Sequence, residues 1–223
     1  MMMAKAPDNE FSDKLIQIAV LAREQLGDVH SAREAALPEC RKAIRSSSLA
    51  IRAIHKGKFD EWSARMTEAA AAVLSAQEAL APFPQIASVG FLHDAEKEVA
   101  EARLTEALVN GGNLPDWSEV GVGLPAWLNG LAEAASELRR NILDRLRYGE
   151  IDIAEKLFLK MEAACDMLAG VDYPDAITGG LRRTTDALRA VVERTRADLT
   201  TTLIQERLGD AIRLAGDGPA SNG

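Results

Sequence analysis

Hydrophobic residues recur every three or four positions along most of this chain, and runs that alternate apolar with polar residues are almost absent. The first hydrophobic stripe contains Phe11, Leu15, Ile18, Ala22, Leu26 and Val29. The second contains Cys40, Ile44, Ser47, Ile51 and Ile54. This spacing places each stripe on one face of an α-helix. Pro38 lies between the stripes and either separates two helices or kinks one very long helix.

Glycine and proline residues mark the ends of the later helices. We expect these helices at about 59–80, 85–109, 124–146, 152–168 and 180–214, with a glycine-rich loop at 113–123. The pattern predicts an all-α protein of six or seven long helices, packed as an antiparallel bundle in a single domain. The expected bounds of the domain are 11–214, with a flexible N-terminus at 1–10 and a disordered tail at 215–223. Helices of this length also favour self-association.

Composition narrows the class of protein. Among 223 residues, 26 Lys and Arg stand against 34 Asp and Glu, which gives a formal net charge of −8. This charge argues against a uniformly basic nucleic-acid coat, although it allows a local basic patch. Aromatic residues make up only 4% of the chain, too few for folds that stack rings on bases. The sequence has neither a signal peptide nor a transmembrane stretch, so we expect a cytoplasmic protein with no membrane partner.

Charged side chains form stripes on two consecutive predicted helices. One stripe is Asp94, Glu98 and Glu101, and the other is Glu133, Glu137 and Arg140. Like charges at these spacings repel each other unless a cation lies among them. If the two helices are antiparallel neighbours, their carboxylates can converge on Mg²⁺ or Mn²⁺. Such an ion activates water and stabilises charge on a phosphate under attack. The alternative interpretation is a solvated acidic face.

A basic stripe follows the second hydrophobic stripe. It consists of Arg41, Arg45, Ser48 and Arg52, with His55 and Lys56 close by. Arginines in a line can bind phosphates through paired hydrogen bonds. Interhelical salt bridges are the equally open alternative.

Other features indicate packing rather than chemistry. The chain has no Walker loop, Rossmann fingerprint, HExxH zinc motif or Glu-x-x-His pattern of di-iron bundles. The two cysteines are expected in the core and exclude both a disulfide framework and a four-cysteine zinc site: Cys40 and Cys165. The histidines are expected at the surface or at helix caps rather than as ligands: His30, His55 and His93. The tryptophans are expected to pack: Trp62, Trp117 and Trp127.

Five blocks of sequence occur in order with consistent spacing. They are AREAALPECRKAIRSSSLAIRAIHKGKF (32–59), KEVAEA (97–102), WLNGLAEAASELRRNIL (127–143), RYGEIDIAEKLF (147–158) and LRRTTDALRAVVERTRADL (181–199). Over about residues 11–203 the chain thereby resembles the translin and translin-associated factor X family.

The resemblance implies a helical subunit that assembles into a hollow octamer and binds single-stranded RNA or DNA. Translin binds nucleic acid with little or no catalysis of its own, whereas translin-associated factor X is a metal-dependent endoribonuclease. The acidic residues of this chain resemble those of the catalytic type, and prokaryotic relatives of that type are expected to form homo-oligomers.

Two motifs carry the catalytic resemblance. The family has Gln-Glu-Tyr-Val-Glu-Ala with two metal-binding glutamates, and this chain has Lys97-Glu98-Val99-Ala100-Glu101-Ala102, without the Gln and the Tyr. The family then has an aspartate three residues after a glycine, followed by Glu-Leu-x-Arg. Here Glu133 replaces the aspartate, while Glu137-Leu138-Arg139-Arg140 matches. An added methylene moves the carboxylate, and Mg²⁺ is demanding about geometry.

The resemblance therefore predicts an Mg²⁺-dependent endoribonuclease, with Mn²⁺ as the alternative ion, acting on single-stranded RNA. The predicted metal and catalytic residues are Glu98, Glu101 and Glu133. The predicted nucleic-acid-binding residues are Arg41, Arg45, Arg52 and Arg140. Two other hypotheses remain: a translin-like protein that binds single-stranded RNA or DNA without cutting it, and a structural scaffold.

Overall fold

The computed structural model describes residues 9–87 and 90–216, and these residues form helices and connecting turns without a strand. The six long helices are α1 (Asn9–His55), α2 (Phe59–Leu80), α4 (Phe91–Asn110), α6 (Leu124–Arg147), α7 (Ile151–Ala169) and α9 (Leu181–Gly216). The three short ones are α3 (Pro84–Ala87), α5 (Trp117–Val120) and α8 (Asp175–Thr178). The predicted all-α class with six long helices is confirmed. Residues 9–10 and 215–216, predicted as parts of the flexible N-terminus and the disordered tail, belong to α1 and α9. Residues 1–8 and 217–223 lie outside the described residues, and for them these two expectations stay predictions.

Pro38 does not divide the first helix. The α1 helix runs without interruption through Pro38, so the two hydrophobic stripes belong to one long helix. The segment before residue 36 is almost wholly exposed, and the buried positions begin at Ala36. Pro38 therefore lies close to the place where α1 enters the body of the molecule.

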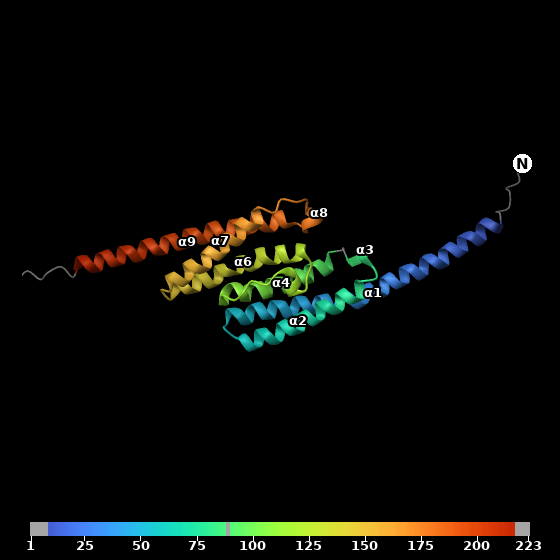
Figure 1. Ribbon diagram of the computed structural model, residues 1–223, viewed down its shortest axis with the longest axis horizontal. Helices are drawn as coiled ribbons and strands as arrows, with labels where there is room; N and C mark the ends of the chain where they lie inside the picture. The colour runs from blue at the N-terminus through green and yellow to red at the C-terminus, as the bar shows by residue number, and fades with distance from the viewer. Residues whose placement is uncertain (1–8, 88–89, 217–223) are drawn as a thin grey trace, which may run out of the picture.

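The helices pack in a chain of neighbours, with the core between them. The second half of α1 packs against α2 and α4, α4 packs against α6, and α6 packs against α7 and α9 (Figure 1). The first half of α1 and the last turns of α9 project from opposite ends of the body (Figure 1). In the described part of the chain, no helix is both long and apolar enough to cross a membrane.

The α4 and α6 helices run in the same direction, so the expectation that they are antiparallel is wrong. Residues early in α4 contact the start of α6, and later residues of α4 contact later residues of α6. The Gly123 amide, just before α6, donates to Glu96, and Lys97 donates to Glu133, further along α6. The connection between the helices returns the chain to the starting end, as Figure 1 shows. Within this connection, Asp116 and Glu119 form a reciprocal capping box around α5.

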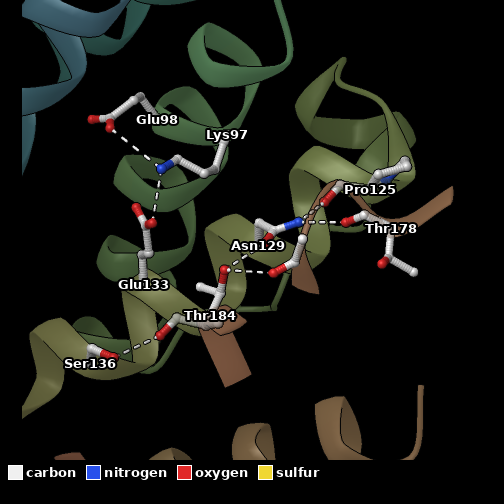
Figure 2. Close-up of polar contacts among 10 residues, drawn as sticks. Lys97, Glu98, Pro125, Asn129, Glu133, Ser136, Thr178 and Thr184 are labelled. Atoms are coloured by element: carbon white, nitrogen blue, oxygen red, sulfur yellow. Dashed lines mark hydrogen bonds and ion pairs between the residues drawn. The ribbon is translucent and has the colours of Figure 1, made fainter. Parts of the chain in front are cut away.

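A buried amide fixes α6 against the helices on its other side. The side chain of Asn129 donates to the carbonyl oxygens of Pro125 (2.9 Å) and Thr178 (2.8 Å) and accepts from the Thr184 hydroxyl (2.7 Å), as Figure 2 shows. A buried amide with several partners is costly to disrupt. Asn129 thus connects α6 to the end of α8 and the start of α9, one turn before Glu133.

Candidate metal centre

Gly130 allows α6 to approach α4 at the position of the acidic residues. A Cβ atom at residue 130 would lie 2.7 Å from the Cβ of Ala100, 2.9 Å from the carbonyl oxygen of Lys97 and 3.0 Å from the amide nitrogen of Glu101. Real side chains do not tolerate such distances, so only glycine permits this backbone separation. The close approach places the next turn of α6, which carries Glu133, beside the Glu98–Glu101 turn of α4.

The three carboxylates predicted to converge lie together. Each of Glu98, Glu101 and Glu133 offers one carboxylate oxygen, and these three oxygens all lie within 4.8 Å of one another. Glu101 is buried, with 8% of its surface exposed, while Glu98 and Glu133 are partly buried. A solvated acidic face does not describe Glu101. Asp94, the remaining acid of the first stripe, is exposed and is not part of this set.

The cluster strongly disfavours three negative charges. Burial, followed by the charges of Glu133, Glu98 and Glu137, and a hydrogen bond with Glu133 raise the pKa of Glu101 to about 9. Burial also raises the pKa of Glu98, against the opposing charge of Lys97. A carboxyl that holds its proton at neutral pH for these reasons marks a place where a positive charge is strongly favoured.

Lys97 supplies a positive charge to this cluster. Its Nζ atom lies 2.8 Å from Oε1 of Glu133 and 3.9 Å from Oε1 of Glu98, between the two carboxylates in Figure 2. Burial by itself lowers the pKa of Lys97, but the hydrogen bond to Glu133 and the charges of the three glutamates outweigh it and raise the pKa. The sequence pattern gave no sign of this contact, because Glu133 lies on a different helix.

A buried histidine extends the polar cluster along α6. Nε2 of His55 lies 2.7 Å from Oε2 of Glu137, and Nδ1 lies 3.3 Å from Nδ2 of Asn141. Only 4% of the His55 side chain is exposed, so the expectation of a surface or capping histidine is wrong for this residue. The hydrogen bond from His55 lowers the pKa of Glu137 against the effect of burial, and the charges of His55 and Arg140 act in the same direction.

The predicted arginine residues are exposed and form no ion pair among the described residues. Arg41, Arg45, Arg52 and Arg140 form no ion pair with any residue of the described ranges, so interhelical salt bridges within the chain do not explain them. By helical spacing, the stripe of Arg41, Arg45 and Arg52 ends at His55, three residues after Arg52. Arg140 follows Glu137 by three residues on α6. The basic stripe therefore leads to the acidic cluster.

Residues expected to pack behave largely as the sequence indicated. Both cysteines, Cys40 and Cys165, are buried. Trp62 and Trp127 are buried, while Trp117 is 44% exposed and contacts Trp127 edge to face. His30 is exposed, as expected.

The residues of the cluster fit a hard divalent cation. Mg²⁺ and Mn²⁺ prefer oxygen ligands, and Mg²⁺ is usually held by one or two carboxylates while it keeps several waters. Glu98, Glu101 and Glu133 provide such oxygens in one place, and the raised pKa of Glu101 reflects first its burial and then the negative charges of its neighbours. Among the described residues, the set contains neither a histidine nor a cysteine, the side chains that zinc prefers as ligands. The set therefore suits Mg²⁺ or Mn²⁺ better than zinc.

No family model matches the chain. It is 27% identical to an uncharacterized protein of Methanocaldococcus jannaschii over 190 residues, which cover 84% of each protein. Two solved structures of AfC3PO are similar: the complex with duplex RNA (TM-score 0.75, 29% identity) and the protein in a further crystal structure (TM-score 0.73, 27% identity). Each match covers 84% of this chain and 97% of the AfC3PO chain. The apo structure of NeC3PO has the same fold (TM-score 0.67, 18% identity, 90% of this chain and 100% of that chain).

Fold and site together define the class: an all-α helical protein with a carboxylate cluster between two parallel helices. AfC3PO is a complex of the translin and translin-associated factor X type. In both fold and sequence, the chain is similar to this translin-type protein.

Proposed function

We propose that this protein is a metal-dependent endoribonuclease that hydrolyses single-stranded RNA as a homo-oligomer. The observation that carries the proposal is the meeting of Glu98, Glu101 and Glu133 in one cluster, with oxygens within 4.8 Å of one another. Carboxylates confined in this way repel each other and need a cation. A purely structural role does not explain why three carboxyl groups are held together despite their mutual repulsion.

The roles of the residues follow from their positions. Glu98, Glu101 and Glu133 would hold Mg²⁺, or Mn²⁺ in its place, and the bound ion supplies a Lewis acid that activates water and neutralises charge on the scissile phosphate. Glu133 has the most exposed side chain of the three, at 33%, and would orient the attacking water. Arg140 is exposed on the same helix and is suited to the phosphate.

The exposed arginine stripe is suited to the sugar-phosphate backbone. Arg41, Arg45 and Arg52 present guanidinium groups on one face of α1, and this face leads to His55 beside Glu137. Guanidinium groups bind phosphates through paired hydrogen bonds and carry no sequence information. RNA as the ligand is further supported by the structure of AfC3PO, which contains duplex RNA.

A binding protein without catalysis is the second candidate. It is favoured by Lys97, whose ammonium group already contacts two of the three carboxylates. In such a protein the lysine would serve as the permanent counter-charge of the cluster, and RNA would be bound by the arginines alone.

Incubation with labelled RNA separates the two candidates. We expect cleavage of single-stranded RNA with Mg²⁺, its disappearance with EDTA, and a loss of at least about a hundredfold in Glu98→Gln and Glu101→Gln. The matched control is Glu155→Gln, an exposed acid on α7 that is expected to cut normally. Incubation with an RNA duplex of the same sequence shows whether cleavage requires a single strand. RNA that is retained but never cut supports the binding protein, and cleavage that survives EDTA contradicts a metal-dependent reaction.

A further inference from the structure

Lys97 occupies an unusual position for a lysine beside a candidate metal centre. It directly precedes Glu98 on α4, and its Nζ atom contacts carboxylates from two helices: Glu133 on α6 at 2.8 Å and Glu98 at 3.9 Å. Only 21% of the Lys97 side chain is exposed. The ammonium group is thus held inside the cluster (Figure 2) rather than directed to solvent.

The contact uses a carboxylate that a metal ion would need. Oε1 of Glu133 accepts the hydrogen bond from Lys97, and Glu98 and Glu133 are both members of the set that can hold an ion. An ammonium group and a divalent cation that share one carboxylate repel each other. The two cations therefore cannot both bind Glu133 at full strength.

We infer that Lys97 is a resident cation that competes with the divalent ion for Glu133 and Glu98, so that metal binding requires the ammonium group to move out of the cluster. This inference rests on the proposed function, since it concerns the same metal centre. The lysine side chain is suited to such a role because its charge lies on four flexible methylene groups. In the metal-free protein Lys97 balances the charge of the cluster, and it lowers the affinity for metal ions by the same interaction.

The first test measures Mn²⁺ affinity by isothermal titration calorimetry. Lys97→Gln removes the charge with little change in length, and we expect it to bind Mn²⁺ about tenfold more tightly, the size of effect of one partly buried charge pair. Lys97→Arg keeps the charge and is expected to bind no more tightly than the wild type. Lys156→Gln makes the same charge change at an exposed site on α7 and is expected to leave the affinity unchanged.

The second test uses the wild-type chain, so it does not depend on how a variant folds. Acetylation of lysines by a reactive ester is followed residue by residue with mass spectrometry, with and without Mn²⁺. We expect the labelling rate of Lys97 to rise several-fold with Mn²⁺ as the ammonium group leaves the cluster, while that of exposed Lys156 stays constant.

The outcomes distinguish the two proposals. Tighter binding by Lys97→Gln, together with metal-induced labelling of Lys97, supports competition. If Mn²⁺ binds, but equally well or less well to Lys97→Gln and without a change in labelling, the competition is overturned while the metal centre stands. If Mn²⁺ binds to neither protein, both the metal centre and the competition are overturned.

Discussion

Glu101 is the residue whose chemistry depends most on its surroundings. It is buried among three other carboxyl groups, and its pKa of about 9 follows from burial and from the charges of Glu133, Glu98 and Glu137. The proton on Glu101 and the ammonium group of Lys97 together offset the repulsion in the metal-free cluster. When a divalent ion binds, we expect Glu101 to release this proton and the ammonium group to move out of the cluster.

The raised pKa of Glu101 predicts how stability depends on pH. A carboxyl whose pKa in the folded protein exceeds its ordinary value stabilises the fold fully below the ordinary value, and this contribution is lost as the pH rises through about 9. We therefore expect the metal-free wild type to lose stability in urea between pH 5 and pH 9, roughly the span between the two pKa values. Glu101→Gln should show a flatter profile, and Glu155→Gln should follow the wild type. Parallel profiles for all three proteins would contradict the buried, protonated carboxyl.

His55 is expected to stabilise Glu137 through their hydrogen bond. Replacement of His55 by alanine leaves the partly buried carboxylate of Glu137 without this donor, which costs on the order of 1–2 kcal/mol in the free energy of unfolding. Since the hydrogen bond lowers the pKa of Glu137, its contribution is present above the ordinary carboxyl pKa and is lost as the pH falls. Urea unfolding at pH 7 and pH 4 measures both effects. His30→Ala, at an exposed site on the same helix, is the control, and an equally small effect at both sites would contradict the role of His55.

At the residue scale, the sequence could identify the acids but not their partners. The spacing of Glu98, Glu101 and Glu133 and the family motifs pointed to three side chains that lie together in the structure. The contacts of Lys97 with Glu133 and of His55 with Glu137 were missed because both glutamates lie on α6, far along the chain, and no local periodicity reports such pairs. One signal was available for His55, since it continues the helical spacing of the arginine stripe.

At the scale of elements, the helix bounds were predictable where glycine and proline mark them. The expected helix at 59–80 agrees with α2, because Gly57 precedes it and Pro82 and Pro84 follow it. The short helices α3, α5 and α8 were missed, although the capping pair Asp116 and Glu119 is a sequence signal for α5. The direction of α6 relative to α4 was predicted wrongly, because it depends on the path of the connection through space.

The close approach of α4 and α6 leads to a prediction for Gly130. Gly130→Ala places a methyl group 2.7 Å from the Cβ of Ala100 and 2.9 Å from the carbonyl oxygen of Lys97, so the helices must separate. We expect a loss of about 1–3 kcal/mol in stability, typical of an overpacked core, and weaker Mn²⁺ binding in calorimetry.

Gly27→Ala is the matched control for Gly130→Ala. No atom lies within 4 Å of the added methyl group at Gly27, and alanine favours the helix over glycine. This variant should keep its Mn²⁺ affinity and be at least as stable as the wild type. If Gly130→Ala behaves in the same way, the close helix contact does not position the carboxylates.

At the scale of the whole molecule, the two projecting helix ends carry exposed apolar side chains. On the first half of α1 these include Phe11 (65% exposed), Leu15 (50%), Ile18 (50%) and Leu26 (68%). On the last turns of α9 they include Ile204, Leu208 and Ile212. Apolar stripes of this length are typical of surfaces that another subunit covers.

The exposed stripe predicts self-association that depends on α1. We expect the wild type to sediment as an oligomer, and the double substitution Leu15→Glu with Ile18→Glu to lower the mass, because it places charges in the apolar stripe. Leu159→Glu makes the same kind of change at an exposed position outside the projecting ends and is the control. A wild type that sediments as a monomer at micromolar concentration would contradict the prediction.

The most direct measurement is a crystal structure of the wild-type protein soaked in Mn²⁺, with anomalous scattering data. We expect an anomalous peak between α4 and α6, bound by oxygens of Glu98, Glu101 and Glu133, with the ammonium group of Lys97 moved away from Glu133. A crystal with no peak at these three glutamates, and with Lys97 still bonded to Glu133, would contradict the metal centre on which the proposed nuclease depends.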